Sequence, residues 1–162
     1  MKKRFNILVL SLSFLLAASF VSCNIEMPCQ ESTDVFLRAQ LCRIDSTGKE
    51  RNIKALVSIK GLDSDSIWCQ EKSLSLLELP LKANDTQSSF EISLNMDTVW
   101  HHDVLSIHHD NQRFFLSMEC GAIVKHHING TELPQQEAIK DIVILNEEVD
   151  NQNTTHLKIY VE

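Results

Sequence analysis

Histidines are the side chains in this sequence best suited to catalysis or metal binding. They form three doublets and one single residue: His101-His102, His108-His109, His126-His127 and His156. Neighbouring residues on a strand point to opposite faces of a sheet, so each doublet can offer one ligand to a given site. If His102, His109 and His127 met on adjacent strands, they would form a three-histidine metal site, as in a periplasmic metal-dependent hydrolase. The alternative is that they are solvent-facing strand or turn residues, and we expect no metal and no cofactor.

Five cysteines are present, and four of them follow the N-terminal leader: Cys29, Cys42, Cys69 and Cys120. An even number in an exported chain indicates two disulfides, for which three connectivities are possible. We prefer Cys29 with Cys120, because this bond would tie the start of the domain to a late strand. Closing so long a loop would stabilise the fold by roughly 4–5 kcal/mol. Cys42 is then left to pair with Cys69.

Other catalytic motifs are missing from the sequence. It contains no Gly-x-Ser-x-Gly elbow of a serine hydrolase, and its four glycines are too dispersed to form a phosphate-binding loop. Trp68 and Trp100 are able to stack on a sugar, although aromatic residues of this kind more often belong to a core or its rim. We therefore expect a protein that is not an enzyme, with a glycan-binding module as an alternative.

The N-terminus has the pattern of a secretory signal peptide. Three basic residues, Lys2 to Arg4, precede an apolar segment from Phe5 to Val21 that is interrupted by Asn6 and three serines. The segment ends in Phe20-Val21-Ser22-Cys23, which resembles the lipobox of bacterial lipoproteins. That resemblance implies cleavage before Cys23 and acylation of its thiol. We therefore assign residues 1–22 to the signal peptide and Cys23 to lipidation.

The residue after the cysteine is Asn24, not Asp. By resemblance to lipoprotein sorting rules, this predicts an outer-membrane lipoprotein. No dense acidic run follows, so we expect the periplasmic face of the cell envelope. The alternative is an ordinary leader cleaved near Ser19 or Ser22, which would release a soluble secreted protein.

Charge restricts the partners of the mature chain. Without the 22-residue leader, 140 of the 162 residues remain, which is a length suited to one domain. The leader holds three of the fifteen basic residues and no acidic one, so the mature part has 12 basic and 22 acidic residues, a net charge of −10 with histidine neutral. This opposes binding to nucleic acid, or to anionic lipid headgroups, through a general positive field. We expect contact with the membrane through the lipid, and an envelope protein or glycan as partner.

Short alternating segments predict an all-β fold. Residues 23–33 are a polar tether, and residues 34–162 form one domain. Within it, Phe90, Ile92 and Leu94 alternate with polar residues, as in a half-buried strand. The predicted strands are 34–44, 55–59, 74–81, 89–94, 104–108, 113–119, 122–129, 139–145 and 156–161. With turns at 109–112 and 129–130, and one helical turn within 133–141, they predict an antiparallel β-sandwich, Ig-like or similar, of about 8–9 strands.

Several motifs occur in a distinctive order. After the lipobox come a second cysteine, Cys29, and then Leu79-Pro80-Leu81; a Phe-rich strand leads into Ser117-Met118-Glu119-Cys120-Gly121, and an Ile-x-Ile hairpin closes the chain. This order resembles a family of bacteroidete lipoproteins that carry a domain of unknown function. The resemblance implies the Cys29–Cys120 pairing, treats Cys42 and Cys69 as additions, and implies no activity.

The same resemblance implies O-glycosylation. Proteins of that bacterial group are often modified at Asp-Ser or Asp-Thr when an apolar residue or Thr follows. Ser46, Ser66 and Thr98 fit this pattern, each in a turn-like segment.

Overall fold

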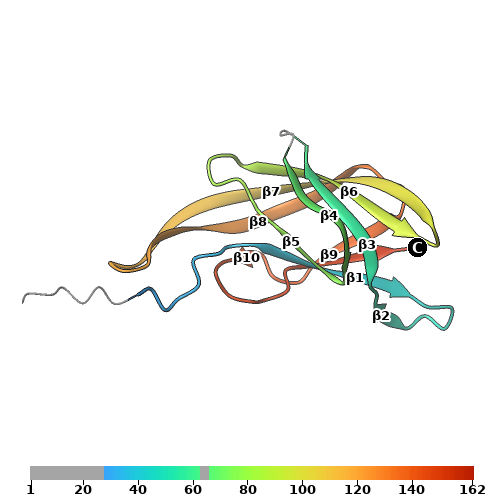
Figure 1. Cartoon of the computed structure of the whole chain (residues 1–162), viewed down its shortest axis with the longest axis horizontal. Helices are drawn as coiled ribbons and strands as arrows, with labels where there is room; N and C mark the ends of the chain where they lie inside the picture. Colours follow the sequence, from blue (N-terminus) through green and yellow to red (C-terminus); the bar gives the residue numbers. More distant parts are fainter. Residues whose placement is uncertain (1–27, 63–65) are drawn as a thin grey trace, which may run out of the picture.

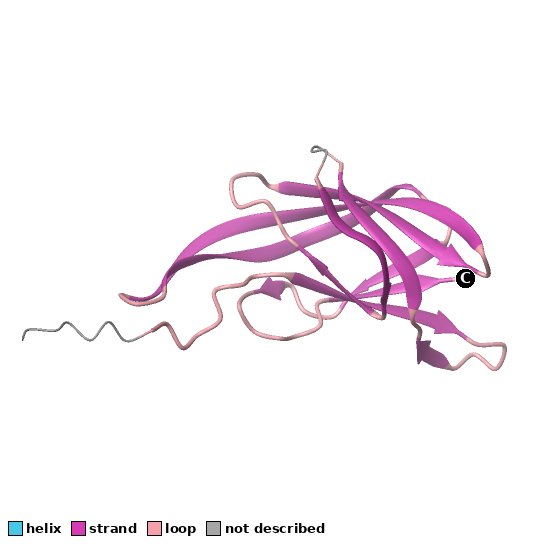
Figure 2. Cartoon of the chain, viewed as in Figure 1, coloured by secondary structure: helices cyan, strands magenta, loops and turns pink. Residues whose placement is uncertain are grey.

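Two β-sheets face each other in the computed structural model, which describes residues 28–62 and 66–162 (Figures 1 and 2). These residues form strands and loops, and none of them is in a helix. The predicted all-β sandwich is therefore confirmed. The leader and Cys23 lie outside the described residues, and no helix among the residues that are described is long and apolar enough to span a membrane.

The first sheet has the order β2-β1-β11-β9, with β5 pairing with β1 as well. Its strands are β1 (Leu37–Ile44), β2 (Glu50–Asn52), β5 (Leu76–Leu79), β9 (Ile139–Ile144) and β11 (Leu157–Val161). The β1–β11 pair is parallel, with Ala39 opposite Leu157. An antiparallel sandwich was predicted, but this one pair of strands is parallel. The two strands come from opposite ends of the domain and lie side by side.

The second sheet is antiparallel throughout and has the order β10-β8-β7-β6-β3-β4. Its strands are β3 (Ala55–Gly61), β4 (Ile67–Leu74), β6 (Gln87–Met96), β7 (Val99–Ser117), β8 (Gly121–Gln135) and β10 (Glu148–Val149). Consecutive strands are neighbours in most of this sheet, which suits the short turns that the sequence predicts.

The long hairpin of β7 and β8 corrects three sequence predictions. The predicted turn at 109–112 is wrong, because β7 continues through it and Asn111 pairs with His126 across the ladder. The predicted turn at 129–130 is also wrong: these residues lie in β8 where the register shifts, with His108 opposite Gly130 and His109 opposite Ile128. The helical turn within 133–141 is absent, since β8 runs to Gln135 and β9 follows.

Strand β4 was not predicted. It is an edge strand, and among its residues only Cys69 is buried, so it carries no alternating apolar pattern. Its pairing with β3 is irregular between Val57 and Ile59, and Glu71 adopts a positive φ of 46° in this stretch. Such an irregularity makes an edge strand a poorer template for unwanted strand pairing.

One apolar core fills the space between the sheets. Leu37, Ala39 and Leu41 of β1 point into it, as their alternation predicts, and Ile92 and Leu94 of β6 meet them from the second sheet. The largest fully buried side chains are Leu37, Leu41, Ile59, Leu77, Leu79, Ile92, Leu94, Leu105, Ile107, Ile128, Ile139 and Leu157. This core holds the two sheets in a fixed relation and so positions the long β7–β8 hairpin.

The hairpin gives the molecule two distinct ends. Figure 1 shows the turn between β7 and β8 at the end where the described chain begins, whereas the C-terminus, the β1–β2 turn and the β6–β7 turn lie at the other end. Any feature at the β7–β8 turn is therefore close to the N-terminal segment.

Candidate functional site

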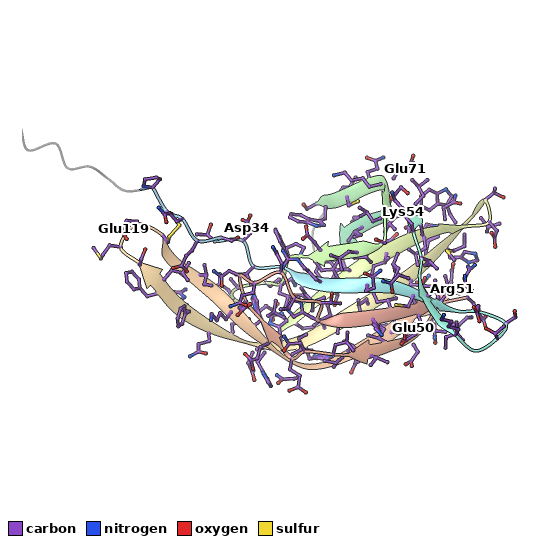
Figure 3. The ribbon with its side chains drawn as sticks, turned by 90° about the horizontal axis from the view of Figure 1, so that it is seen from below. Asp34, Glu50, Arg51, Lys54, Glu71 and Glu119 are labelled. Carbon is purple, nitrogen blue, oxygen red and sulfur yellow. A yellow bond between two sulfur atoms is a disulfide. The ribbon has the colours of Figure 1, made fainter. Side chains whose placement is uncertain are left out.

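A disulfide links the N-terminal segment to the tip of the β7–β8 hairpin. Cys29 and Cys120 are bonded, with their Cα atoms 4.8 Å apart and a sequence separation of 91. Figure 3 shows the bond beside the labelled Glu119, at the same end of the molecule as Asp34. The preferred pairing is confirmed.

Local hydrogen bonding explains the Ser117-to-Gly121 motif. The backbone N–H of Cys120 donates to Ser117 Oγ at 3.1 Å, and Gly121 has a φ of +73°. Ser117 lies opposite Gly121 in the ladder, so the three residues between them form the loop. A three-residue hairpin loop followed by a left-handed glycine is a common way to reverse a strand, because glycine adopts positive φ without steric cost. The motif therefore shapes the turn that presents Cys120.

Large apolar side chains lie exposed around this disulfide. Phe114, Phe115 and Met118 are 44%, 59% and 86% exposed. A cation lies beside them, since Lys125 Nζ is 4.1 Å from the centre of the Phe114 ring. The sequence shows these residues as part of a Phe-rich strand, but their exposure follows from the extension of the hairpin beyond its neighbours.

The second predicted disulfide is wrong. Cys42 and Cys69 are both free and buried. Cys42 is on β1 of the first sheet, with its Sγ 3.5 Å from Asn52 Oδ1, whereas Cys69 is on β4 of the second sheet, with its Sγ 3.7 Å from the Val57 carbonyl oxygen. Burial, and next the Glu50 carboxylate, raise the pKa of the Cys42 thiol. Neither thiol is placed for disulfide formation or nucleophilic chemistry.

Two histidines meet inside the hairpin, but they are not the predicted set. His109 and His126 are buried, and their Nδ1 atoms lie 2.8 and 2.6 Å from the same oxygen, Asn111 Oδ1. The Asn111 amide nitrogen donates to the carbonyl oxygens of Lys82 and Asp85, so its oxygen faces the rings and both histidines donate from Nδ1. This assigns the tautomer of each ring from the network.

The network continues to the loop before β6. His109 Nε2 lies 2.9 Å from Ser88 Oγ, which donates to it, and the same hydroxyl accepts the backbone N–H of Lys82 at 2.9 Å. Burial lowers the pKa of His109; for His126, burial and then His109 lower it to about 4. Both rings therefore stay neutral at neutral pH and serve to join the hairpin to residues 82–88.

The three-histidine hypothesis is not supported by the positions of its residues. His109 points into the network. His127 lies on the opposite face of the hairpin, because successive residues of a strand alternate between the two faces. It is exposed, and its Nδ1 is 2.6 Å from Glu148 Oε1. His102 lies farther along β7, with its Nδ1 2.8 Å from Ser93 Oγ. Within residues 28–62 and 66–162, no three His, Cys, Asp or Glu side chains are grouped so that they could hold a metal ion.

Two further buried polar groups have structural partners. The Asp103 carboxylate accepts three backbone N–H groups, from Glu137 at 2.6 Å, Ile139 at 3.1 Å and Ala138 at 3.2 Å. Nδ1 of His156 accepts the backbone N–H of Arg38 at 2.9 Å. Sequence reasoning missed both, because partners 34 to 118 positions away leave no local pattern.

A pocket of about 160 Å³ opens beside Trp68. The indole Nε1–H donates to the Glu78 carbonyl oxygen at 2.7 Å, and the ring centre lies 5.5 Å from that of Phe36. Trp68 therefore bridges β4 and β5, yet it remains 45% exposed. The pocket is lined by Gly61, Leu62, Ser66, Trp68, Pro80, Lys82, Ser88, Ser89 and Phe90. Trp100 is absent from this lining and pairs with Asn95 elsewhere in the sheet.

A family of unknown function, DUF6452, matches residues 56–161 of the sequence. The chain belongs to this family. No curated protein and no solved structure matches the chain. The resemblance noted in the sequence is thus confirmed as far as an uncharacterised domain, while the lipoprotein character and bacterial group remain predictions.

Most of the features described above lie within the segment that matches the DUF6452 family. It covers the Trp68 pocket, the histidine pair and Cys120, whereas Cys29 precedes it. The three positions predicted for O-glycosylation are exposed: Ser46 in the β1–β2 turn, Thr98 in the β6–β7 turn, and Ser66 just before β4. Their modification remains a prediction.

Proposed function

We propose that this DUF6452 protein is an outer-membrane lipoprotein that faces the periplasm, anchored by an acylated Cys23, and that its sandwich is a non-catalytic binding or assembly module. The Cys29–Cys120 disulfide carries this proposal. Structural disulfides form in exported proteins and are rare in the cytosol of mesophiles. The bond begins six positions after Cys23, so it holds the folded body next to the proposed anchor.

The number of acyl chains on Cys23 determines how firmly the proposed anchor holds. A single acyl chain binds a membrane only marginally, because each buried methylene contributes roughly 0.8 kcal/mol, whereas two or three chains hold it firmly. Glycosylation at Ser46, Ser66 and Thr98 belongs to the same proposal, since all three positions are exposed.

The buried polar groups support a role that is not catalytic. The carboxylate of Asp103 and the rings of His109 and His126 each bond to groups of the fold itself, and the pKa of each ring is lowered by burial. A general base at neutral pH needs access to substrate and a pKa near the working pH. These residues serve the architecture instead.

Cell fractionation of a Cys23→Ala variant tests the anchor. We expect the variant to leave the membrane fraction, whereas Cys69→Ala, the same exchange at a buried free thiol, stays there with the parent. Mass spectrometry of the mature N-terminus supplies a second readout, with acyl chains expected on Cys23. A Cys23→Ala protein that remains in carbonate-washed membranes would overturn the lipoprotein assignment.

Glycan binding at the Trp68 pocket is the second candidate. The partly exposed indole and Pro80 offer apolar surface, while the exposed Ser66 offers polar groups beside them. This is the usual composition of a small-ligand pocket. Titration with envelope glycans is expected to change the indole fluorescence of the parent and of Trp100→Phe, but not of Trp68→Phe. An equal response in Trp68→Phe would exclude the pocket.

A further inference from the structure

The tip of the β7–β8 hairpin is the feature that the proposed function leaves unexplained. Phe114, Phe115 and Met118 expose 44%, 59% and 86% of their surface within five positions of one another. Scattered exposed apolar residues are ordinary, but a group of large ones at a protruding turn is typical of a binding surface. Figure 1 shows this turn at the extreme end of the molecule.

The covalent connection identifies the occupant. The tip carries Cys120, bonded to Cys29, and only six positions separate Cys29 from Cys23. Six residues span at most about 20 Å when fully extended. If Cys23 is in the bilayer, the tip is held within that distance of the membrane surface.

A second contact keeps the segment after Cys29 on the body. The Asn151 side-chain amide donates to the Ser32 carbonyl oxygen at 2.8 Å. The N-terminal segment is thus attached to the body at two points, the hairpin tip through the disulfide and the loop after β10 through Asn151. The distance from the anchor to the tip therefore depends on the residues between Cys23 and Cys29 and not on the whole tether.

The residues beside the aromatic rings suit a lipid interface. Arg113 is exposed on the same strand and on the same face as Phe115, whereas Lys125, on the other face, lies over the Phe114 ring and 4.0 Å from Asp150 Oδ2. Long basic side chains extend toward headgroup phosphates while their alkyl stems cover apolar surface. Aromatic and apolar residues next to such cations are the composition of interfacial segments.

We propose that the β7–β8 tip inserts Phe115 and Met118 into the interfacial zone of the same membrane that holds the Cys23 lipid. This rests on the proposed lipid anchor. The insertion would reach about 5–10 Å into the boundary between headgroups and acyl chains. It would orient the sandwich with the tip against the membrane and with the opposite end, which carries the β1–β2 and β6–β7 turns, directed away from it.

Fluorescence quenching by brominated lipid tests the insertion. Phe115→Trp and Met118→Trp are made in the full lipidated protein and reconstituted into phosphatidylethanolamine and phosphatidylcholine vesicles, with acyl-brominated phosphatidylcholine as quencher. The parent gives the signal of Trp68 and Trp100 for subtraction. Val99→Trp, an equally exposed apolar position at the other end, is the matched control.

We expect the added indole at 115 or 118 to lose most of its fluorescence and to emit at shorter wavelength, while the indole at 99 is unchanged. Vesicle flotation separates the two proposals. If the protein with Cys23 intact does not float with the vesicles, both the proposed lipid anchor and the proposed insertion are refuted. Flotation with unquenched indoles at 115 and 118 removes the insertion alone. A blue shift that depends on protein density and not on brominated lipid would instead assign the tip to contact between copies of the chain.

Discussion

The imidazole rings of His109 and His126 meet edge to face in the β7–β8 hairpin, with their centres 5.1 Å apart and both Nδ1 atoms against one Asn111 oxygen. Two cations so close together would repel each other, and a proton on His109 Nε2 would remove the acceptor of the Ser88 hydroxyl. The pair thus makes the fold sensitive to acid.

We expect the free energy of unfolding to decrease as the pH falls below about 6.5. An unfolded His126 takes up a proton near pH 6.5, whereas the folded ring resists protonation until about pH 4, so acid favours the unfolded chain. This difference corresponds to about 3 kcal/mol once pH 4 is reached. The lowered pKa values of His109 and His156 act in the same direction.

Urea unfolding between about pH 7.5 and pH 5 measures this loss above the range in which most carboxylates titrate. His126→Asn is expected to have a shallower pH dependence, because it keeps a donor for Asn111 and cannot titrate. His127→Gln is the control. Its imidazole is exposed, and the hydrogen bond to Glu148 raises its pKa, so its removal leaves the acid sensitivity in place. An unchanged pH dependence in His126→Asn would contradict the prediction.

Removal of the disulfide by Cys29→Ser with Cys120→Ser is expected to lower the free energy of unfolding. The bond closes a loop over 91 positions. In the chain-entropy model, such a loop contributes roughly 4–5 kcal/mol. Denaturant unfolding measures the change, and Met118→Ser, an exposed exchange in the same loop, is expected to stay within about 0.5 kcal/mol of the parent. Equal stability of the double variant and the parent would refute this prediction.

Alkylation tests the state of the other two cysteines. In folded protein carrying Cys23→Ala, iodoacetamide is expected to modify neither Cys42 nor Cys69, because both are buried and the pKa of Cys42 is raised. After unfolding without reductant, both thiols should react, and intact mass should show two additions. Two further additions should appear only after reduction. If no thiol reacts in denaturant before reduction, Cys42 and Cys69 are bonded to each other and the prediction is wrong.

Asp103→Asn is expected to destabilise the fold by about 2–3 kcal/mol, because hydrogen bonds to a buried carboxylate are lost and an amide group then faces backbone donors. The carboxylate is fully buried and accepts the N–H groups of the first residue of β9 and of the two residues before it. Glu137→Gln is the matched control, since this carboxylate is exposed and its acceptor for the His102 N–H survives the change. Urea unfolding of the two variants measures the difference. Similar stabilities would show that the charge of Asp103 contributes little.

Strands with one buried face could be predicted from the sequence. In β1 and β6, alternating apolar residues follow the pleat, and the structure confirms that Leu37, Leu41 and Ile92 enter the core. Strand β4 could not be predicted, because an edge strand with one buried residue has no such alternation. The polar centre of β7 was misjudged as a turn, because Asn111 and Asp110 favour turns locally and are kept in the strand by β8.

The candidate site also has parts that could be predicted from the sequence and parts that could not. The Cys29–Cys120 bond was predicted. The turn that presents Cys120 was not, because the strand predicted over 113–119 includes Met118 and Glu119, which belong to that turn. The histidine pair was not predictable as a pair. Its members belong to different doublets. His109 shares a face with Asn111 because the two are two positions apart on β7, but the register between β7 and β8 places His126, and not His127, opposite Asn111.

The sequence by itself determined the all-β class, the export-type leader pattern and one disulfide, because these depend on composition, on local periodicity and on a few spaced residues. Only the tertiary structure decided which histidines meet, that Cys42 and Cys69 lie in different sheets, and that the Phe-rich turn protrudes beside the N-terminal segment. The physical reason is that strand order and register arise from the summed packing of the core, and no short segment contains that information.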